Sequence, residues 1–313
     1  MFTRTAALLA ALLFLGTTPV NAAEKLTVLL DWFVNPDHGP LIVADKKGFF
    51  ADEGLEVELI APADPNDPPK LVAAQKADIA VSYQPQLHIQ AAEGLPLVRF
   101  GTLVATPLNT LVVLADGPVK SIADLKGRKV GFSVGGFEDA LLGAMLKKHG
   151  LTLSDVELIN VNFSLSPAII SGQVDAVIGA FRNFELNQMD IVGKPGRAFF
   201  VEEEGVPPYD ELIYIAHKDR LDDPRLKKFL AAVERATQYL VNHPDDAWAA
   251  FIDGRKELDD ELNKRAWRDT LPRFALRPAA LDRGRYERFA AFMKESGLIN
   301  KDVKTELYAT ELQ

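Results

Sequence analysis

The chain of 313 residues contains no cysteine. This absence excludes a disulfide framework, a Cys/His metal cluster and a lipid anchor on an N-terminal cysteine. HExxH and EF-hand patterns are also missing, and we expect no metal site. Because neither GxGxxG nor a GK[ST] phosphate loop occurs, we expect no nucleotide cofactor and no other cofactor.

The sequence also has fewer positive than negative charges and few long apolar runs. The chain has 35 Lys and Arg against 44 Asp and Glu, a formal net charge of −9. Such a balance disfavours binding to nucleic acid or to an anionic membrane surface. Apart from the N-terminus, no segment approaches the roughly 20 apolar residues that a membrane helix needs. We therefore expect no insertion into a membrane.

The N-terminus has the pattern of a secretory signal peptide. Residues 1–22 combine an early charge at Arg4, the apolar stretch ALLAALLFLG and the small-residue ending Val20-Asn21-Ala22. We expect cleavage near Ala22/Ala23 and a mature protein free in the bacterial periplasm.

Short apolar strands alternate with helical stretches as far as about residue 218. The expected strands are 26–30, 57–60, 78–82, 130–134, 157–161 and 175–180, with helices between them at about 41–48, 70–75, 85–93, 137–150 and 166–172. This alternation is typical of the α/β class. From Asp223 onward the patterns predict helices without strands. About 290 mature residues exceed one ordinary core and favour two lobes.

Two segments, 75–86 and 172–185, share an Asp, an apolar run and then polar and aromatic residues. In open α/β sheets, ligands bind beyond the carboxyl ends of the strands. We therefore expect both segments to face one cleft through Ser82, Tyr83, Gln84, Phe181, Asn183 and Glu185. Segments 108–116 and 211–219 are predicted linkers. They divide the chain into lobe 1 (23–109 with 211–313, including the C-terminal helices) and an inserted lobe 2 (110–210).

The run DWFVNPDHGP (31–40) closes the first expected strand. An indole offers a large apolar face, and an Asn amide both donates and accepts hydrogen bonds, so Trp32 and Asn35 suit a flat heteroaromatic ligand. Asp31 and His38 are secondary candidates. In the alternative interpretation Trp32 is core, Asn35-Pro36 is a turn and His38 caps a helix. Asp37 and His38 are better explained as shaping the loop.

Gly135-Gly136 stands between an expected strand and an expected helix. Free backbone N–H groups at such a turn suit a phosphate, a formyl oxygen or a carboxylate, although two glycines also serve a turn alone. Gly135 is therefore a candidate contact and Gly136 a secondary one.

This architecture resembles the type II periplasmic solute-binding proteins of ABC importers. Four segments are similar to the family that groups ThiY-type pyrimidine-binding proteins with the yeast pyrimidine-precursor synthases: DWFVNPDHGPLIVADKKGFFADEGLEVEL, ADIAVSYQPQLHIQAAEGLPL, DLKGRKVGFSVGGFEDALL and VDAVIGAFRNFEL. The resemblance implies mixed or parallel sheets flanked by helices, with a ligand cleft between the lobes.

The resemblance also implies a ligand. A thiamin-related 4-aminopyrimidine, either formylaminopyrimidine or hydroxymethylpyrimidine, would be held by a monomer and passed to an ABC permease in the inner membrane for thiamin salvage. Glu185 would accept from the exocyclic amine and pair with a protonated ring nitrogen. The ring edge and faces would meet Asn35, Asn183, Trp32, Tyr83 and Phe181. The alternative for Glu185 is a solvated carboxylate in the first turn of a helix.

Other solutes stay open, because relatives with two such lobes carry sulfonates, nitrate, riboflavin or other small organic molecules. Arg182 is the only basic residue within the proposed site segments. An anionic ligand calls for Arg or Lys in the cleft. The composition therefore favours a neutral or weakly cationic heterocycle.

Two enzyme alternatives also stay open. The GFSVG segment matches the GxSxG nucleophile pattern at Ser133, with Asp175 or Asp210 and then His217 downstream, although no HGGG-like motif precedes it. The pyrimidine synthases carry a CCCFC motif that this chain lacks. Ser82 and Gln86 stand where their lysine and donor histidine would be, with His88 nearby. We therefore expect a binding protein that performs no chemistry.

Overall fold

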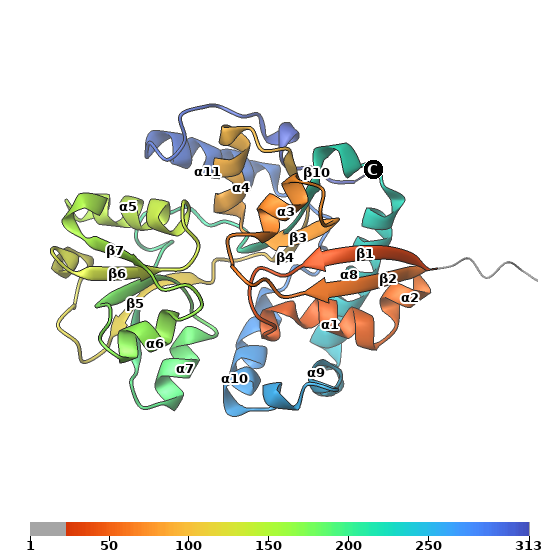
Figure 1. The fold of residues 1–313 in the computed structure, drawn as a ribbon, viewed down its shortest axis with the longest axis horizontal. Coiled ribbons are helices and arrows are strands. Elements are labelled where there is room, and N and C mark those ends of the chain that lie inside the picture. The colour runs from red at the N-terminus through yellow and green to blue at the C-terminus, as the bar shows by residue number, and fades with distance from the viewer. Residues whose placement is uncertain (1–22, 313) are drawn as a thin grey trace, which may run out of the picture.

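The computed structural model describes residues 23–312, which form two five-stranded sheets lying side by side with helices packed around each (Figure 1). The predicted signal peptide, residues 1–22, lies outside the described residues. We refer to the first sheet with its helices as lobe 1 and to the second as lobe 2. None of the helices in 23–312 has both the length and the apolar character that a membrane crossing requires.

Lobe 1 contains a mixed sheet in the order β2-β1-β3-β10-β4. Strand β1 is parallel to β2 and β3, whereas β10 is antiparallel to β3 and β4. The strands are β1 (Glu24–Leu29), β2 (Leu55–Ile60), β3 (Ile79–Ser82), β4 (Leu97–Val104) and β10 (Leu212–His217). All residues of β3, β4 and β10 are buried, as expected for strands covered on both faces.

Lobe 2 repeats this plan in the order β7-β6-β8-β5-β9. Strand β6 is parallel to β7 and β8, and β5 is antiparallel to β8 and β9. The strands are β5 (Asn109–Leu114), β6 (Lys129–Phe132), β7 (Glu157–Asn160), β8 (Ala176–Phe181) and β9 (Gly196–Phe200). The α/β class is confirmed, with both sheets mixed rather than wholly parallel.

Helices cover both sheets. The α-helices of the first two thirds of the chain are α1 (Gly39–Lys46), α2 (Phe49–Asp52), α3 (Pro68–Ala73), α4 (Gln84–Glu93), α5 (Glu138–Lys148), α6 (Leu165–Ile170) and α7 (Glu185–Ile191). The C-terminal region adds α8 (Pro224–Asn242), α9 (Pro244–Ile252), α10 (Glu261–Thr270) and α11 (Arg283–Glu295). Short 3-10 turns are η1 (Pro36–His38), η2 (Ile122–Leu125), η3 (Leu153–Asp155), η4 (Lys218–Arg220), η5 (Lys256–Leu258), η6 (Leu271–Arg273) and η7 (Thr305–Leu307).

Helix α8 shows how the predicted C-terminal helices dock on lobe 1. The Asp223 side chain accepts the Arg225 N–H as an N-cap, and Pro224 occupies the first helical position. Buried residues then recur at helical spacing and face α1 and α2: Leu226, Phe229, Leu230, Val233, Ala236 and Leu240. Helix α10 instead contacts both η1 of lobe 1 and α7 of lobe 2. The C-terminal region therefore bridges the two lobes.

The prediction that 108–116 and 211–219 are linkers is wrong. These segments form β5 and β10, which lie between two partners in sheets of different lobes. Both are apolar runs whose burial on two faces makes them interior strands.

The chain passes between the sheets at 105–108 and again at 201–211. The Glu211 carboxylate ties the two passages together. Its Oε2 accepts the N–H groups of Leu108 (2.6 Å) and Asn109 (2.8 Å) and the hydroxyl of Tyr209 (3.1 Å). Burial raises the pKa of Glu211 to about 7.

Candidate functional site

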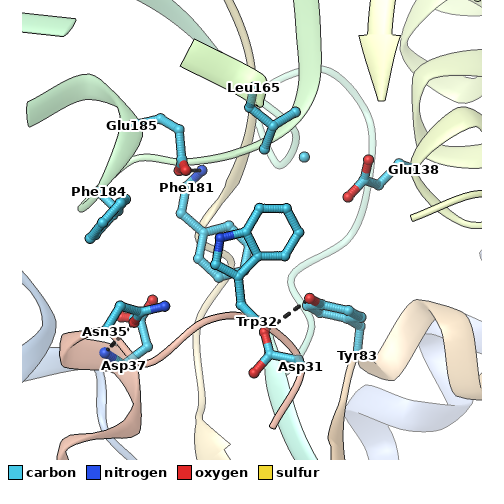
Figure 2. Close-up of a pocket in the computed structure, with 11 residues that line it drawn as sticks. Asp31, Trp32, Asn35, Asp37, Tyr83, Glu138, Leu165, Phe181, Phe184 and Glu185 are labelled. Carbon is cyan, nitrogen blue, oxygen red and sulfur yellow. Dashed lines mark hydrogen bonds between the residues drawn. The ribbon is translucent and has the colours of Figure 1, made fainter. Parts of the chain in front are cut away.

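A cavity lies between the lobes, where carboxyl ends of strands from both sheets meet. Figure 2 shows lobe 1 contributing the loop after β1 and the end of β3, while lobe 2 contributes the facing wall. The lining residues are Asp31, Trp32, Asn35, Asp37, Tyr83, Glu138, Leu165, Gly179, Phe181, Phe184 and Glu185.

The loop after β1 is held by its own side chains. Asn35 Oδ1 accepts the Asp37 N–H (2.8 Å), and Asn35 Nδ2 donates to the Phe33 carbonyl (3.1 Å). The His38 ring in turn accepts the Asn35 N–H at Nδ1 (3.3 Å), which completes a capping box around η1. The turn at Asn35-Pro36 and the capping role of His38 are therefore present. Asn35 also lines the cavity.

Asp31 joins this loop to the end of β3. Its Oδ1 pairs with His38 Nε2 (2.9 Å), and its Oδ2 accepts the Tyr83 hydroxyl (2.9 Å). Since His38 Nδ1 accepts a backbone N–H, the hydrogen-bond network assigns the ring proton to Nε2. Burial and the nearby Asp31 charge raise the pKa of Tyr83 well above its ordinary value. Tyr83 is thus fixed as a hydrogen-bond donor within the wall of lobe 1.

Aromatic rings close the space between the lobes. Trp32 rises from the lobe 1 loop into the middle of the site (Figure 2). Its ring meets Phe163 edge-on at a centroid distance of 4.6 Å, and Phe33 meets Phe184 at 5.8 Å. Because Phe163 and Phe184 belong to lobe 2, these pairs cross the cleft. The sequence analysis missed both, although each follows the carboxyl end of a strand, which is the signal that selected Phe181.

Glu185 opens α7 and points into the cavity (Figure 2). Its Oε2 accepts the Phe181 N–H (2.7 Å), and only 7% of the residue is exposed. Burial, with a smaller contribution from the Asp37 charge, raises the pKa of Glu185 to about 8. The carboxyl group is therefore protonated at neutral pH in this structure and can both donate and accept a hydrogen bond.

Glu138 faces Glu185 from the opposite end of the lobe 2 wall (Figure 2). Its Oε2 accepts the Ser133 N–H (2.7 Å), and burial raises its pKa to about 8. The sequence analysis missed this residue because an acidic residue in the first turn of a helix is ordinarily a solvated one. Gly135 and Gly136 predict a turn before Glu138, but they do not indicate which side chain enters the cavity.

Asn183 lies beside the cavity rather than in its lining. Its Nδ2 donates to Asp37 Oδ1 (2.6 Å) and to Thr270 Oγ1 (2.7 Å), and Thr270 donates to the same Asp37 oxygen (3.0 Å). Burial raises the pKa of Asp37 to about 6. This trio joins the loop between β8 and α7 of lobe 2 to η1 and α10 of lobe 1.

Five other predicted contacts lie outside the lining: His38, whose bonds are given above, Ser82, Gln84, Gly135 and Gly136. Ser82, at the end of β3, donates to Gln86 Oε1 of α4 (3.1 Å), and Gln84 Oε1 accepts the Asp210 N–H (2.8 Å) from the second passage between the lobes. The remaining two, Gly135 and Gly136, have their N–H groups bound by side chains of the protein itself.

The charge of the lining is one-sided. Four carboxyl groups surround the cavity, from Asp31, Asp37, Glu138 and Glu185, and no Lys or Arg lines it. Arg182, the basic residue of the site segments, instead pairs with Glu202 (2.6 Å). Such a lining suits ligands rich in hydrogen-bond donors or carrying positive charge, with aromatic rings for their flat faces.

The residues considered for catalysis are not assembled. Ser133 donates its hydroxyl to the Asn162 carbonyl, and Asp175 pairs with Arg128 (3.2 Å). His217 ends β10 in the other sheet, where it caps η4. A Ser-Asp-His triad is therefore absent among these residues.

His88 has no part in the cavity. It is buried in lobe 1, where Nδ1 bonds the Tyr308 hydroxyl (3.2 Å) and the ring packs on Tyr286 and Phe289. Burial lowers the pKa of His88 to about 3. Within residues 23–312, no cluster of His, Asp and Glu is arranged to hold a metal ion.

Comparisons with known proteins place this site in context. The chain is 56% identical over 298 residues to a Haemophilus influenzae protein provisionally named for thiamine biosynthesis, with 95% of both chains covered. It is 34% identical to the formylaminopyrimidine-binding protein of Halalkalibacterium halodurans, covering 82% of this chain and 80% of that one. It is 29% identical to the 4-amino-5-hydroxymethyl-2-methylpyrimidine phosphate synthase of Aspergillus parasiticus, covering 81% and 78%.

Solved structures show the same fold. A Candida albicans protein with the generic periplasmic binding protein fold has a TM-score of 0.74 at 17% identity, covering 92% of this chain and 97% of that one. The alkanesulfonate-binding protein of Xanthomonas axonopodis pv. citri has a TM-score of 0.72 at 16% identity, covering 92% and 99%. The type II periplasmic binding protein fold is thereby confirmed. Residues 35–247 match the family described as NMT1/THI5 like, and with the close relatives above this shows that the chain belongs to the NMT1/THI5-like family.

Proposed function

We propose that this protein is the periplasmic solute-binding component of an ABC importer and that it binds a thiamin-related aminopyrimidine, either formylaminopyrimidine or hydroxymethylpyrimidine. The observation that carries the proposal is Glu185. Its carboxyl group is bound on one oxygen by the Phe181 N–H and is directed into a cavity lined by aromatic rings and no cation.

A 4-aminopyrimidine presents an amine donor beside a ring-nitrogen acceptor. A protonated Glu185 complements both positions, since it accepts from the amine and donates to the nitrogen. Transfer of that proton to the ring gives a charge-assisted pair with the same geometry. Trp32, Tyr83 and Phe181 provide surfaces for the flat ring, and Asn35 stands at the edge of the cavity. Relatives named for pyrimidine binding support the same ligand class.

The ligand would be captured when the two lobes close on it by bending at the two connecting segments, 105–108 and 201–211. Contacts that cross the cleft favour the closed arrangement, in particular Trp32 with Phe163 and Asn183 with Asp37. A ligand that touches both walls adds to these contacts only when the lobes are closed, and this difference drives closure. We propose that the closed monomer then delivers its ligand to an inner-membrane permease for thiamin salvage.

Two alternatives are less well supported. A sulfonate would place a negative charge against four carboxyl groups with no cation to offset it. Synthase chemistry has little support in this chain, which lacks cysteine and buries His88 among aromatic rings away from the cavity. A binding protein without catalysis accounts for the arrangement.

Calorimetry of the purified mature protein tests the proposal with formylaminopyrimidine, hydroxymethylpyrimidine, thiamin, riboflavin and taurine. We expect one of the two pyrimidines to bind most tightly. Trp32→Ala should weaken that binding by about 1.5–3 kcal/mol, because a stacking surface is lost. Tight binding of taurine or riboflavin with no response to either pyrimidine would refute the ligand assignment.

A further inference from the structure

The turn between β6 and α5 is the place in the site where an anion would ordinarily bind. The consecutive backbone N–H groups of residues 133–136 lie there, just ahead of the 11-residue helix α5. In this protein, acceptors from its own side chains bind these groups. Glu138 accepts from Ser133 (2.7 Å), and a hydrogen bond from the Val134 N–H also lowers the pKa of Glu138, against the larger effect of burial.

The two glycines of the turn are bound in the same way. Asn66, which belongs to lobe 1, accepts the Gly135 N–H (3.1 Å), and its Nδ2 donates to the Ser133 carbonyl (3.3 Å). Asp139 accepts the Gly136 N–H (2.6 Å). Of these acceptors, Glu138 alone lines the cavity.

Space for the Glu138 carboxyl group is built into β8. Gly179 lies against it with φ +96°, and a Cβ atom at Gly179 would overlap the carboxyl group. The same residue marks an irregular stretch of pairing with β5, where Asn109 Oδ1 accepts the Gly179 N–H (3.0 Å). A buried glycine at positive φ beneath a 4% exposed carboxyl group indicates a fixed position rather than a surface rotamer.

We propose that Glu138 is a specificity-determining residue: by occupying N–H groups in the turn between β6 and α5, it makes the cavity accept an uncharged or cationic heterocycle and reject its phosphate ester and other anions. This inference rests on the proposed function and adds the class of ligand that the site excludes. A phosphate oxygen and a carboxyl oxygen are both acceptors, so they compete for the same N–H groups. An anion entering near Glu138 also finds no Lys or Arg among the lining residues to bind it.

The experiment compares hydroxymethylpyrimidine, its phosphate ester and inorganic phosphate by calorimetry. The variants are Glu138→Ala, which removes the acceptor, Glu138→Gln, which keeps an acceptor oxygen without charge, and Asp139→Ala as the matched control. Asp139→Ala removes a neighbouring acidic side chain that also accepts a backbone N–H group of the turn, but this side chain lies outside the cavity lining. Thermal melts establish that each variant is folded.

We expect the unmodified protein to prefer the uncharged pyrimidine to its phosphate ester. In Glu138→Ala this ratio should fall roughly 10- to 100-fold, the usual effect of a hydrogen bond to a charged group, with Glu138→Gln in between. Asp139→Ala should leave the ratio unchanged. An unaltered ratio in folded Glu138→Ala or Glu138→Gln overturns the inference, as does an equal fall in Asp139→Ala.

Binding of inorganic phosphate tests the role of Glu138 independently of the proposed pyrimidine ligand. If no pyrimidine binds the unmodified protein, the proposed ligand is wrong. A gain of phosphate binding in Glu138→Ala but not in Asp139→Ala would still assign anion exclusion to Glu138. Absence of that gain, together with normal pyrimidine binding and an unaltered ratio, rejects the role of Glu138 alone.

Discussion

The two walls of the cavity are built from similar residues but do different work. In the lobe 1 wall, Asp31 is engaged on both oxygens by His38 and Tyr83. In the lobe 2 wall, Glu138 and Glu185 are each bound by backbone N–H groups, and each has a pKa raised to about 8. A carboxyl group with both oxygens bound by side chains supports a wall, whereas a desolvated one bound by backbone N–H groups alone is available to a ligand.

The largest expected effect on ligand affinity comes from a substitution in the lobe 2 wall. Glu185→Gln should weaken binding of the preferred pyrimidine by about 1.5–3 kcal/mol, because an amide cannot transfer a proton to the ring nitrogen and the charge-assisted pair is lost. Calorimetry measures the change. Glu203→Gln, the same substitution on an exposed residue, is the control. Unchanged affinity in Glu185→Gln would remove Glu185 from the ligand site.

A substitution in the lobe 1 wall should instead lower the stability of the folded protein. Asp31→Asn replaces one carboxylate oxygen by an NH2 group, which cannot accept a hydrogen bond. Either His38 or Tyr83 therefore loses its acceptor. We expect the free energy of unfolding in urea to fall by about 1–3 kcal/mol. Tyr83→Phe, which removes one of the two bonds, should cost less. A stable Asp31→Asn variant that no longer binds pyrimidine would show that Asp31 serves the ligand and would undo the contrast between the walls.

The pH dependence sharpens the comparison further. The pKa of Glu185 is raised to about 8 from an ordinary 4.5, so the folded protein holds a proton that the unfolded chain releases. Stability without ligand should therefore fall as pH rises from about 4.5 to 8. Pyrimidine affinity should fall above about pH 8, where the shared proton is lost. The limiting slope is about tenfold, or 1.4 kcal/mol, per pH unit.

Calorimetry from pH 6 to pH 9.5 measures this slope, with Glu185→Gln as the control that should flatten it. A wild-type affinity that stays constant across pH 9 would contradict a proton shared between Glu185 and the ring.

The smallest expected effect on ligand affinity comes from substitutions in the contact between the two lobes. Asn183→Ala and Thr270→Val each remove part of the trio with Asp37, and each should weaken ligand binding by about 0.5–1.5 kcal/mol through the closed arrangement. The double variant should lose less than the sum of the two, because both act on one network. Additive losses, with Asn183→Ala much the larger, would instead make Asn183 a direct contact of the ligand.

The sequence pattern anticipated one part of the site well. Trp32, Tyr83, Phe181 and Glu185 follow strand ends, and all of them line the cavity. Strand ends can be recognised from local apolar runs, and parallel strands bring those ends to one edge of a sheet. The pattern could not rank side chains within such a segment. Asn183 joins the lobes while Phe184 lines the cavity, because the direction of each depends on how α7 packs against α10.

By itself, the sequence determined the α/β class, six of the strands with the helices between them, the capped loop after β1 and the net acidity. Each of these depends on residues close together in the chain, through spacing, capping and composition. Tertiary structure alone decided that the expected linkers are interior strands and that Glu138, Phe163 and Phe184 reach the site. Burial raises the pKa of both facing glutamates to about 8, and that burial is a property of the folded chain that residue spacing does not reveal.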